Sequence, residues 1–129
     1  MKDPFKQQGA FSWFELMTSD VDGAKIFYSS LFGWDTEDMP MGDMNYTVVK
    51  VGEESLGGIM TVPPQAEGTP PNWGVYVTVN DVDATARKAE ELGGKVLVPP
   101  TDIPNVGRFS VLQDPQGAVI SAITYVQNV

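Results

Sequence analysis

The order of apolar and polar residues between positions 11 and 18 alternates along the chain, and this pattern predicts a β-strand. In a strand, successive side chains point to opposite faces, so the alternation assigns each residue to a face. One face carries Trp13, Glu15 and Met17, and the other carries Phe14 and Leu16. A carboxylate therefore lies between two large apolar side chains on a single face.

From position 21 the apolar spacing changes to i, i+3, i+4, which is typical of an amphipathic helix. We predict a helix over residues 21–32, preceded by acidic residues that suit a helix N-terminus and followed by Gly33, a usual stop. The side chains expected on its buried stripe are Val21, Ala24, Phe27, Tyr28 and Leu31.

The same kinds of pattern predict the elements in the rest of the chain. An acidic loop is expected over 35–43, strands over 44–51 and 56–62, and a Pro-rich linker over 63–72. Further strands are expected over 73–79, 95–98, 108–113 and 118–126, with a helix over 82–92. Pro99 and Pro100 are expected to stop the short strand that precedes them.

The strand-and-helix unit occurs twice. Moving the chain by 61 positions places Asp20 on Asp81, and it also aligns Val21 with Val82, Asp22 with Asp83, Leu31 with Leu92 and Gly33 with Gly94. A period of this length is too long for a solenoid repeat. It indicates two related modules inside one domain, each built as strand, helix and then three mostly antiparallel strands.

The predicted fold class is therefore α+β, with two pseudo-repeated βαβββ modules whose curved sheets surround a central cleft. We expect residues 1–10 to form a loose arm and residues 11–126 to form a single domain, with module one at 11–62 and module two at 73–126. The helices are expected to cover Phe14, Leu16, Val75 and Val77, while the opposite faces line the cleft.

Composition narrows the function classes. The net charge of −9 argues against a nucleic-acid partner, because phosphate contacts need clustered Lys and Arg. No apolar run is long enough for a membrane helix, and the absence of Cys and the hydropathy pattern favour a cytoplasmic location. With neither His nor Cys in the chain, acid–base chemistry would fall to Asp, Glu, Lys or Tyr.

Several motifs resemble the vicinal oxygen chelate superfamily, which includes glyoxalase I, bleomycin-resistance proteins and extradiol dioxygenases. The matching segments, spread over roughly residues 11–125, are Trp13-Phe14-Glu15-Leu16, Phe27-Tyr28, Leu31-Phe32-Gly33-Trp34, Val77-Val79-Asp81-Val82-Asp83, Leu92-Gly93-Gly94, Gly107-Arg108-Phe109 and Asp114-Pro115-Gln116-Gly117-Ala118. The resemblance implies the two-module fold with a cleft. It is strongest to short members whose first strand begins Trp-x-Glu-Leu.

In metal-dependent members, the resemblance implies a ligand near the start of each module's first strand and another on each last strand. Carried over to this chain, those positions are Trp13, Gly58, Gly74 and Ser121. None of these residues supplies a strong ligand for a divalent ion, and Glu15 alone does not make such a site. The expectation is a protein with no metal and no cofactor, which removes the superfamily's shared chemistry but keeps the cleft.

The resulting candidate ligand-binding residues are Trp13, Glu15, Met17, Tyr46, Met60, Tyr76, Phe109 and Ser121. Trp13 either stacks on a planar ligand or fills the volume of a lost metal site. Glu15 is either a site residue or a paired structural carboxylate, and Tyr76 is a candidate partner for it. Tyr46 and Phe109 are expected to add apolar wall, and Met44 and Met60 suit an adaptable lining. Met17 is expected to face the cleft beside Glu15.

Other charged and aromatic residues receive structural interpretations. Trp73 is expected to pack, the four Asp residues at the helix starts are expected to cap the helices, and Arg108 is expected to pair with Asp102 or Asp114.

Three functions remain open from sequence. The first is a metal-free binding protein for a small aromatic or cationic molecule, similar to the bleomycin-resistance type. The second is a metal-independent lyase or isomerase that uses Glu15 and Tyr76 as acid and base. The third is a structural or regulatory module with a closed cleft. The resemblance also implies a homodimer.

Overall fold

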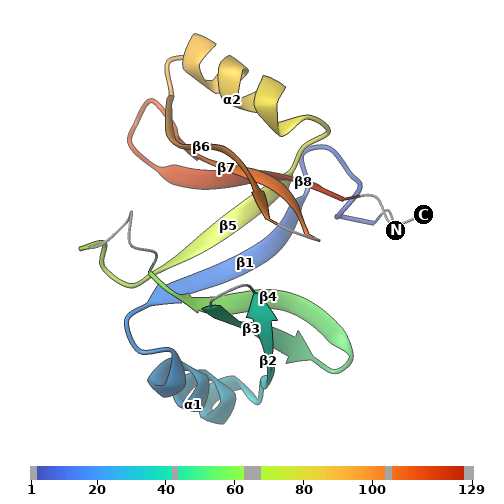
Figure 1. The fold of residues 1–129 in the computed structure, drawn as a ribbon, viewed down its shortest axis with the longest axis vertical. Coiled ribbons are helices and arrows are strands. Elements are labelled where there is room, and N and C mark those ends of the chain that lie inside the picture. The colour runs from blue at the N-terminus through green and yellow to red at the C-terminus, as the bar shows by residue number, and fades with distance from the viewer. Residues whose placement is uncertain (1–2, 42–43, 63–67, 104–105, 127–129) are drawn as a thin grey trace. The chain divides into compact units, whose positions relative to one another are not determined.

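The computed structural model describes residues 3–41, 44–62, 68–103 and 106–126. These residues form two helices and eight strands, which confirms the predicted mixed α+β fold (Figure 1). The chain divides into two compact units, one of residues 13–74 and one of residues 1–12 and 75–129. The boundaries fall close to the ends of the two modules expected from the repeat. The single-domain assignment itself stays a prediction.

The first unit contains one helix, and we call it the α1 unit. Its elements are β1 (Phe11–Thr18, of which the first two residues belong to the other unit), α1 (Val21–Phe32), β2 (Asp35–Met41), β3 (Met44–Val51) and β4 (Glu54–Thr61). The strand order is β2-β3-β4-β1. Strand β1 pairs with β4 in parallel, and the other two pairs are antiparallel.

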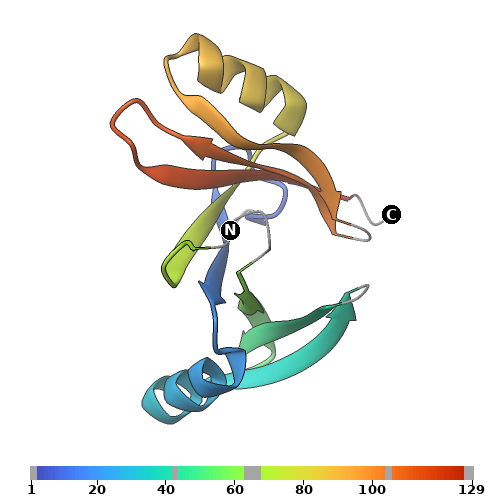
Figure 2. The same ribbon diagram turned by 60° about the vertical axis from the view of Figure 1, so that its left-hand side comes forward.

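The second unit, the α2 unit, repeats this plan. Its elements are β5 (Asn72–Thr78, from Val75 onward), α2 (Val82–Glu91), β6 (Lys95–Ile103), β7 (Gly107–Gln113) and β8 (Val119–Tyr125). The strand order is β5-β8-β7-β6, again with one parallel pair, β5 with β8. Within this unit α2 packs on one face of the sheet (Figure 2). The predicted βαβββ order is therefore present in both halves.

Both helices begin as the sequence predicts. Asp20 Oδ1 accepts a hydrogen bond from the Gly23 amide at 2.9 Å, and Asp81 Oδ1 accepts one from the Ala84 amide at 3.1 Å. Each bond satisfies an amide of the first turn, which has no partner inside the helix. Helix α1 ends at Gly33, whose φ of 74° lies in the left-handed region that favours glycine.

The prediction of an acidic loop over 35–43 is wrong, because residues 35–41 form strand β2 at the edge of the sheet. Two acidic side chains of this strand have cationic or hydroxyl partners. Asp38 accepts hydrogen bonds from Thr47 Oγ1 at 2.8 Å and from Lys25 Nζ at 3.0 Å, and Glu37 pairs with Lys50 at 3.3 Å. These contacts lower the pKa of the Asp38 carboxyl, the hydrogen bond from Thr47 more than that from Lys25. Charged edge strands of this kind also discourage pairing with other chains.

The prediction that a strand ends before Pro99 and Pro100 is also wrong, because β6 continues to Ile103. Strand β6 is the last in the strand order of its unit, so it has one edge without a paired strand there. Proline, which has no amide donor, is tolerated on such an edge. The register shifts twice between Val96 and Thr101, and these irregularities accommodate the two prolines.

The apolar core of each unit lies between its helix and its sheet. In the α2 unit, Val82 and Ala86 of the helix pack on Val79, Leu112 and Ala122. In the α1 unit, Val21, Ala24 and Tyr28 pack on Leu16, Val49 and Ile59. Leu16 is buried as predicted.

Three predicted core positions of the α1 unit are exposed. Phe14 is 44% exposed, and Phe27 and Leu31 are each 57% exposed. Val21, Ala24 and Tyr28 alone fill the contact with the sheet. Phe27 and Leu31 extend the apolar stripe beyond the edge of that contact, and for this reason the i, i+3, i+4 spacing overstates what the helix buries.

The N-terminal arm is not loose over its described part. Gly9 donates to the Thr78 carbonyl at 2.8 Å, and the Thr78 amide donates to the Ala10 carbonyl at 2.9 Å. Thr78 Oγ1 also donates to the Pro4 carbonyl at 2.7 Å, and the ring of Phe5 meets Tyr125 edge-on at 5.0 Å. The arm is therefore fastened to the α2 unit. Of the predicted linker, residues 63–67 lie outside the described residues, and β5 begins at Asn72.

Candidate functional site

The clearest polar arrangement on the predicted ligand-binding residues is a chain of two hydrogen bonds in the α1 unit. Trp13 Nε1 donates to the Tyr46 hydroxyl oxygen at 2.8 Å, and the Tyr46 hydroxyl donates to Glu15 Oε2 at 2.7 Å. Glu15 is only 7% exposed, whereas Trp13 and Tyr46 are half-buried. We call these three residues the triad.

The strand register explains why the triad forms. Trp13 and Glu15 lie on one face of β1, as the alternation predicts. Glu15 pairs with Gly58 of β4, and Met17 pairs with Met60 on the same face. A Cβ atom at Gly58 would overlap the Tyr46 hydroxyl and its ring. The absence of a side chain at position 58 therefore creates the space in which Tyr46 reaches Glu15.

The direction of the hydrogen bonds follows from the donor inventory. An indole N–H only donates, so Tyr46 accepts from Trp13 and gives its own proton to Glu15. A buried carboxylate is costly unless such donors satisfy it. Tyr46, for which the sequence predicts only an apolar wall, contributes a polar hydroxyl to the triad. No sequence signal indicated this contact, because the spacing of Tyr46 from Trp13 and Glu15 carries no local pattern.

In the α2 unit the corresponding face brings together the other three candidates. Tyr76 of β5 pairs with Ser121 of β8, and the rings of Tyr76 and Phe109 lie 6.5 Å apart at an angle of 55°. Tyr76 is buried, and Phe109 and Ser121 are half-buried. These contacts place the three residues on one face of one sheet. A role in binding for any of them stays a prediction.

The residues at the metal positions implied by the family resemblance do not fit a divalent ion. Gly58 and Gly74 have no side chain, Trp13 offers only an indole donor, and Ser121 offers a neutral hydroxyl. Among the described residues, no group of three or more acidic side chains is placed to hold a metal ion.

The structure also shows a feature that the sequence did not predict, an apolar pocket of about 440 Å³ in the α1 unit. Four rings form one wall, and they contact one another at centroid distances between 5.1 and 6.1 Å. The lining residues are Phe14, Tyr28, Phe32, Trp34, Val49, Val51, Leu56, Gly57 and Trp73. We call it the α1 pocket. Its signal in the sequence is the density of aromatic residues between 27 and 34, of which the helical spacing assigned Phe27 and Tyr28 to the buried stripe.

Trp73 belongs to this pocket. Its Nε1 donates to the Tyr28 hydroxyl at 3.2 Å, and its ring meets Tyr28 edge-on at 5.3 Å. The contacts agree with the packing role expected for Trp73. They also place it in the α1 unit, although the repeat had assigned its position to the second module.

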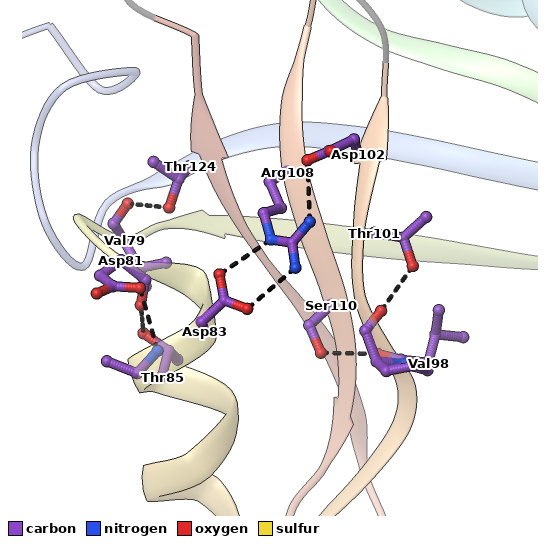
Figure 3. Close-up of polar contacts among 12 residues, drawn as sticks. Val79, Asp81, Asp83, Thr85, Val98, Thr101, Asp102, Arg108, Ser110 and Thr124 are labelled. Carbon is purple, nitrogen blue, oxygen red and sulfur yellow. Dashed lines mark hydrogen bonds and ion pairs between the residues drawn. The ribbon is translucent and has the colours of Figure 1, made fainter.

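Arg108 makes a branched ion pair in the α2 unit (Figure 3). Its Nε and Nη2 donate to the two carboxylate oxygens of Asp83 at 2.9 and 3.1 Å, and its Nη1 donates to Asp102 at 3.0 Å. The predicted Asp102 partner is confirmed, whereas Asp114 instead accepts from the amides of Gln116 and Ala118. The hydrogen bonds from Arg108 hold the pKa of the Asp83 carboxyl below its ordinary value of 3.8, and they raise the pKa of Arg108. This cluster links α2 to β6 and β7 and has a structural role.

Within the residues that the structure describes, no helix combines the length and the apolar character needed to cross a membrane.

Sequence comparison places these features in a family. The model of the glyoxalase/bleomycin resistance protein/dioxygenase superfamily matches residues 10–121, so the chain belongs to this superfamily and the resemblance seen in its motifs is confirmed. Proteins of this fold bind small-molecule ligands and often form dimers.

Two curated relatives illustrate the range of the family. CFP32 of Mycobacterium tuberculosis, whose name assigns it provisionally to the glyoxylases, is 44% identical over 118 residues, which are 91% of this chain and 44% of that protein. The anthracycline biosynthesis protein DnrV of Streptomyces peucetius is 34% identical over 115 residues, which are 89% of this chain and 41% of that protein. The chain thus spans less than half the length of these relatives.

Solved structures agree on the fold. The methylmalonyl-CoA epimerase of Mycobacterium tuberculosis has a TM-score of 0.67 at 14% identity, covering 95% of this chain and 92% of that one. The protein BH1468 of Bacillus halodurans has a TM-score of 0.68 at 12% identity, covering 95% of this chain and 99% of that one. At these identities the similarity extends to the fold and not to the activity.

Proposed function

We propose that the chain is a small-molecule binding protein of the glyoxalase/bleomycin-resistance type that works without a divalent metal. The observation that carries the proposal is the triad. Where the resemblance implies a metal ligand, the structure has Trp13, hydrogen-bonded through Tyr46 to the buried Glu15. This arrangement places the half-buried indole of Trp13 on the same strand face as a buried, hydrogen-bonded carboxylate.

The chemistry of the triad favours an aromatic or cationic ligand. The half-buried indole of Trp13 suits stacking on a planar ring, and Glu15 together with the net charge of −9 favours a positive group. Met17 and Met60 lie beside each other and supply an adaptable apolar lining. Relatives at 33–34% identity are named for anthracycline biosynthesis, so polycyclic aromatic compounds are the first class to test. Tyr76, Phe109 and Ser121 remain proposed contacts, and the cytoplasm remains the proposed location.

The test is a ligand screen by thermal shift, with polycyclic aromatic amines in the panel, followed by titration of the hits. Trp13→Leu is expected to weaken the affinity for a hit by about tenfold or more, since stacking on one aromatic side chain is worth about 1–3 kcal/mol. Trp73→Leu removes the same side chain from the α1 pocket and is the matched control. Equal losses in both variants would contradict a site at the triad.

The metal-independence of the proposal has its own test. Elemental analysis of protein purified without added metal is expected to find Zn, Ni, Fe and Mn far below one ion per chain. A stoichiometric amount of any of them would refute this part of the proposal while leaving the fold assignment intact.

A second candidate function is a metal-independent lyase or isomerase in which Glu15 exchanges a proton with the substrate. The burial of Glu15 favours it, because catalytic carboxylates are commonly held in such surroundings. Glu15→Gln keeps an oxygen that can accept from Tyr46. If this variant binds a hit as the unmodified protein does but loses turnover, the chain is an enzyme. If binding and turnover are both unchanged, Glu15 is structural.

A further inference from the structure

The α1 pocket is a cavity that the proposed function does not use. Its volume of about 440 Å³ is within the usual range for a small-molecule site. None of the candidate ligand-binding residues predicted from the sequence lines it. The pocket therefore needs an explanation of its own.

The α1 pocket and the triad lie on opposite faces of the sheet in the α1 unit. Phe14 of β1 pairs with Gly57 of β4, and both residues line the pocket. The next residues along these strands, Glu15 and Gly58, also pair with each other, and the Tyr46 hydroxyl lies against them. Successive side chains of a strand point to opposite faces. A molecule in the pocket is therefore separated from the triad by the sheet itself.

The aromatic rings of the pocket form two walls that are nearly perpendicular to each other. The rings of Tyr28 and Trp34 are stacked, with centroids 5.6 Å apart and 22° between their planes. The ring of Trp73 meets both of them edge-on, at 5.3 and 6.0 Å and at 81° to each plane. Aromatic rings attract one another in offset-stacked and edge-to-face arrangements. A flat aromatic molecule in this corner can make both kinds of contact at once.

Contacts within the chain hold the walls apart. The indole of Trp73 is fixed by its ring contacts and by the hydrogen bond from its Nε1 to the Tyr28 hydroxyl at 3.2 Å. Movement of Trp73 into the pocket would break that bond. The atoms that line a void have no contact partners on one side. An occupant of matching shape gains these contacts, and the walls that it meets are already ordered.

The lining of the pocket selects against charge. All nine lining residues are uncharged. Their polar side-chain groups are one hydroxyl and two indole N–H groups, and the indole of Trp73 already donates to Tyr28. An ionised group placed here would lose its hydration without gaining an ion partner, which is costly.

We propose that the α1 pocket binds an uncharged, planar aromatic molecule at a site separate from the triad. The two sites then differ in chemistry, because the proposed ligand of the triad is cationic and lies on the face that carries Glu15. The inference therefore does not depend on the proposed function. It concerns the pocket and not the outer side of α1, whose exposed Ile26, Phe27 and Leu31 do not line it.

The test uses phenylnaphthylamine, an uncharged fused-ring dye whose fluorescence rises in apolar surroundings. It is expected to bind at one site per chain with a Kd of about 10 µM or lower, in line with the affinity that a ligand of its size obtains from apolar contact. Trp73→Leu removes one wall and is expected to weaken binding by about tenfold or more. Val51→Trp places a large ring at a lining position that is 50% exposed, and it is expected to abolish saturable binding by filling the pocket.

The dependence on ligand charge is tested with anilinonaphthalene sulfonate, which has the same ring system and one negative charge. In about 0.3 M salt, which screens the general repulsion by the acidic chain, it is expected to bind about tenfold or more weakly than the uncharged dye. Equal affinities for the two dyes would overturn the proposal of an uncharged ligand.

Ile26→Ala is the matched control, because Ile26 is 71% exposed on α1 and does not line the pocket. It is expected to keep the affinity of the unmodified chain, and far-UV circular dichroism checks that every variant is folded. No saturable binding at roughly 100 µM protein would overturn the proposal. Binding that survives both pocket substitutions, or that Ile26→Ala weakens equally, would show adhesion to exposed apolar surface and would also overturn it.

Trp13→Leu separates this proposal from the proposed function. Cationic hits at the triad are expected to depend on Trp13, and the uncharged dye is expected to depend on Trp73. A loss of dye binding in Trp13→Leu but not in Trp73→Leu would assign the dye to the triad, which overturns the pocket proposal and leaves the proposed function standing.

Discussion

Tyr46 joins a tryptophan and a carboxylate through one hydroxyl group. The two side chains it contacts are 31 and 33 positions away along the chain, so the contact depends on the pairing of β3, β4 and β1. A hydroxyl in this position both orients the indole and satisfies part of a buried charge. Its removal therefore affects stability as well as binding.

Tyr46→Phe is expected to lower the free energy of unfolding by about 1–3 kcal/mol, because Glu15 loses a donor in a buried position. Tyr28→Phe is the control, since that hydroxyl only accepts an exposed hydrogen bond from Trp73 and is expected to cost less than about 0.5 kcal/mol. Urea unfolding measures both. Similar losses in the two variants would show that the triad is not an energetic unit.

Gly58→Ala tests the close approach of Tyr46 to β4. The added methyl group overlaps the phenol, so either the ring or the strand must move, at a cost of about 1–3 kcal/mol. In a Tyr46→Ala background the methyl group no longer meets the ring, and most of that cost is expected to disappear. A cost that remains unchanged in the double variant would assign it to the backbone of β4.

The ion pair of Arg108 with Asp83 predicts a pH dependence of stability. The pKa of the Asp83 carboxyl is lowered in the folded chain, so its contribution is present above its unfolded pKa of 3.8 and is lost as the pH falls through the lower folded value. Asp83→Asn removes this contribution. The difference in unfolding midpoint between the two proteins is therefore expected at pH 6 and should shrink below about pH 4. An equal difference at both pH values would mean that the charge of Asp83 is not responsible.

The predictions of helices and strands were correct where the residues of the element itself carry the signal. Both helices begin at an aspartate that caps the first turn, and this local signal, together with the apolar spacing, was enough to predict their positions. The two incorrect assignments concern edge strands, β2 and β6. There an acidic sequence or two prolines oppose strand formation locally, and pairing with the neighbouring strand overrides them. Such pairing is not visible in the sequence of the element itself.

The caps themselves allow a direct test of this interpretation. Asp81→Ala is expected to cost about 1 kcal/mol of stability by leaving the Ala84 amide without its acceptor. Asp22→Ala is the control, because it also removes an acidic residue from a first helical turn but not the capping one. Thermal unfolding followed by circular dichroism compares the two. A loss as large for Asp22→Ala would indicate that general charge, and not capping, is responsible.

The candidate site was predicted only in part. Strand alternation placed Trp13, Glu15 and Met17 on one face, and the register confirms that arrangement. Helical spacing assigned Phe27 and Leu31 to the core, where they are not found. Periodicity gives the width of an apolar stripe but not the surface that covers it, which is why an interface and a core look alike in a sequence.

At the scale of the whole molecule, the acidic balance opposes association of like copies. Screening by salt weakens that repulsion and leaves apolar contact intact. Any self-association of the chain through apolar surface is therefore expected to strengthen by several-fold when the ionic strength rises from about 0.02 to 0.3 M, over which the Debye length shortens from roughly 20 to 6 Å. Sedimentation equilibrium at both salt concentrations measures this change. Weaker association at high salt would indicate a contact made by opposite charges instead.

The close fit of Tyr46 over Gly58 also restricts how this lineage can change. Any side chain introduced at position 58, including a histidine or glutamate that would begin to rebuild a metal site, overlaps the Tyr46 phenol. A larger residue at position 58 therefore requires the Tyr46 ring to move or to be replaced, and either change disturbs the hydrogen bond that Tyr46 donates to Glu15. Substitutions at positions 46 and 58 are thus expected to depend on each other, so that a change at one is tolerated better once the other has changed.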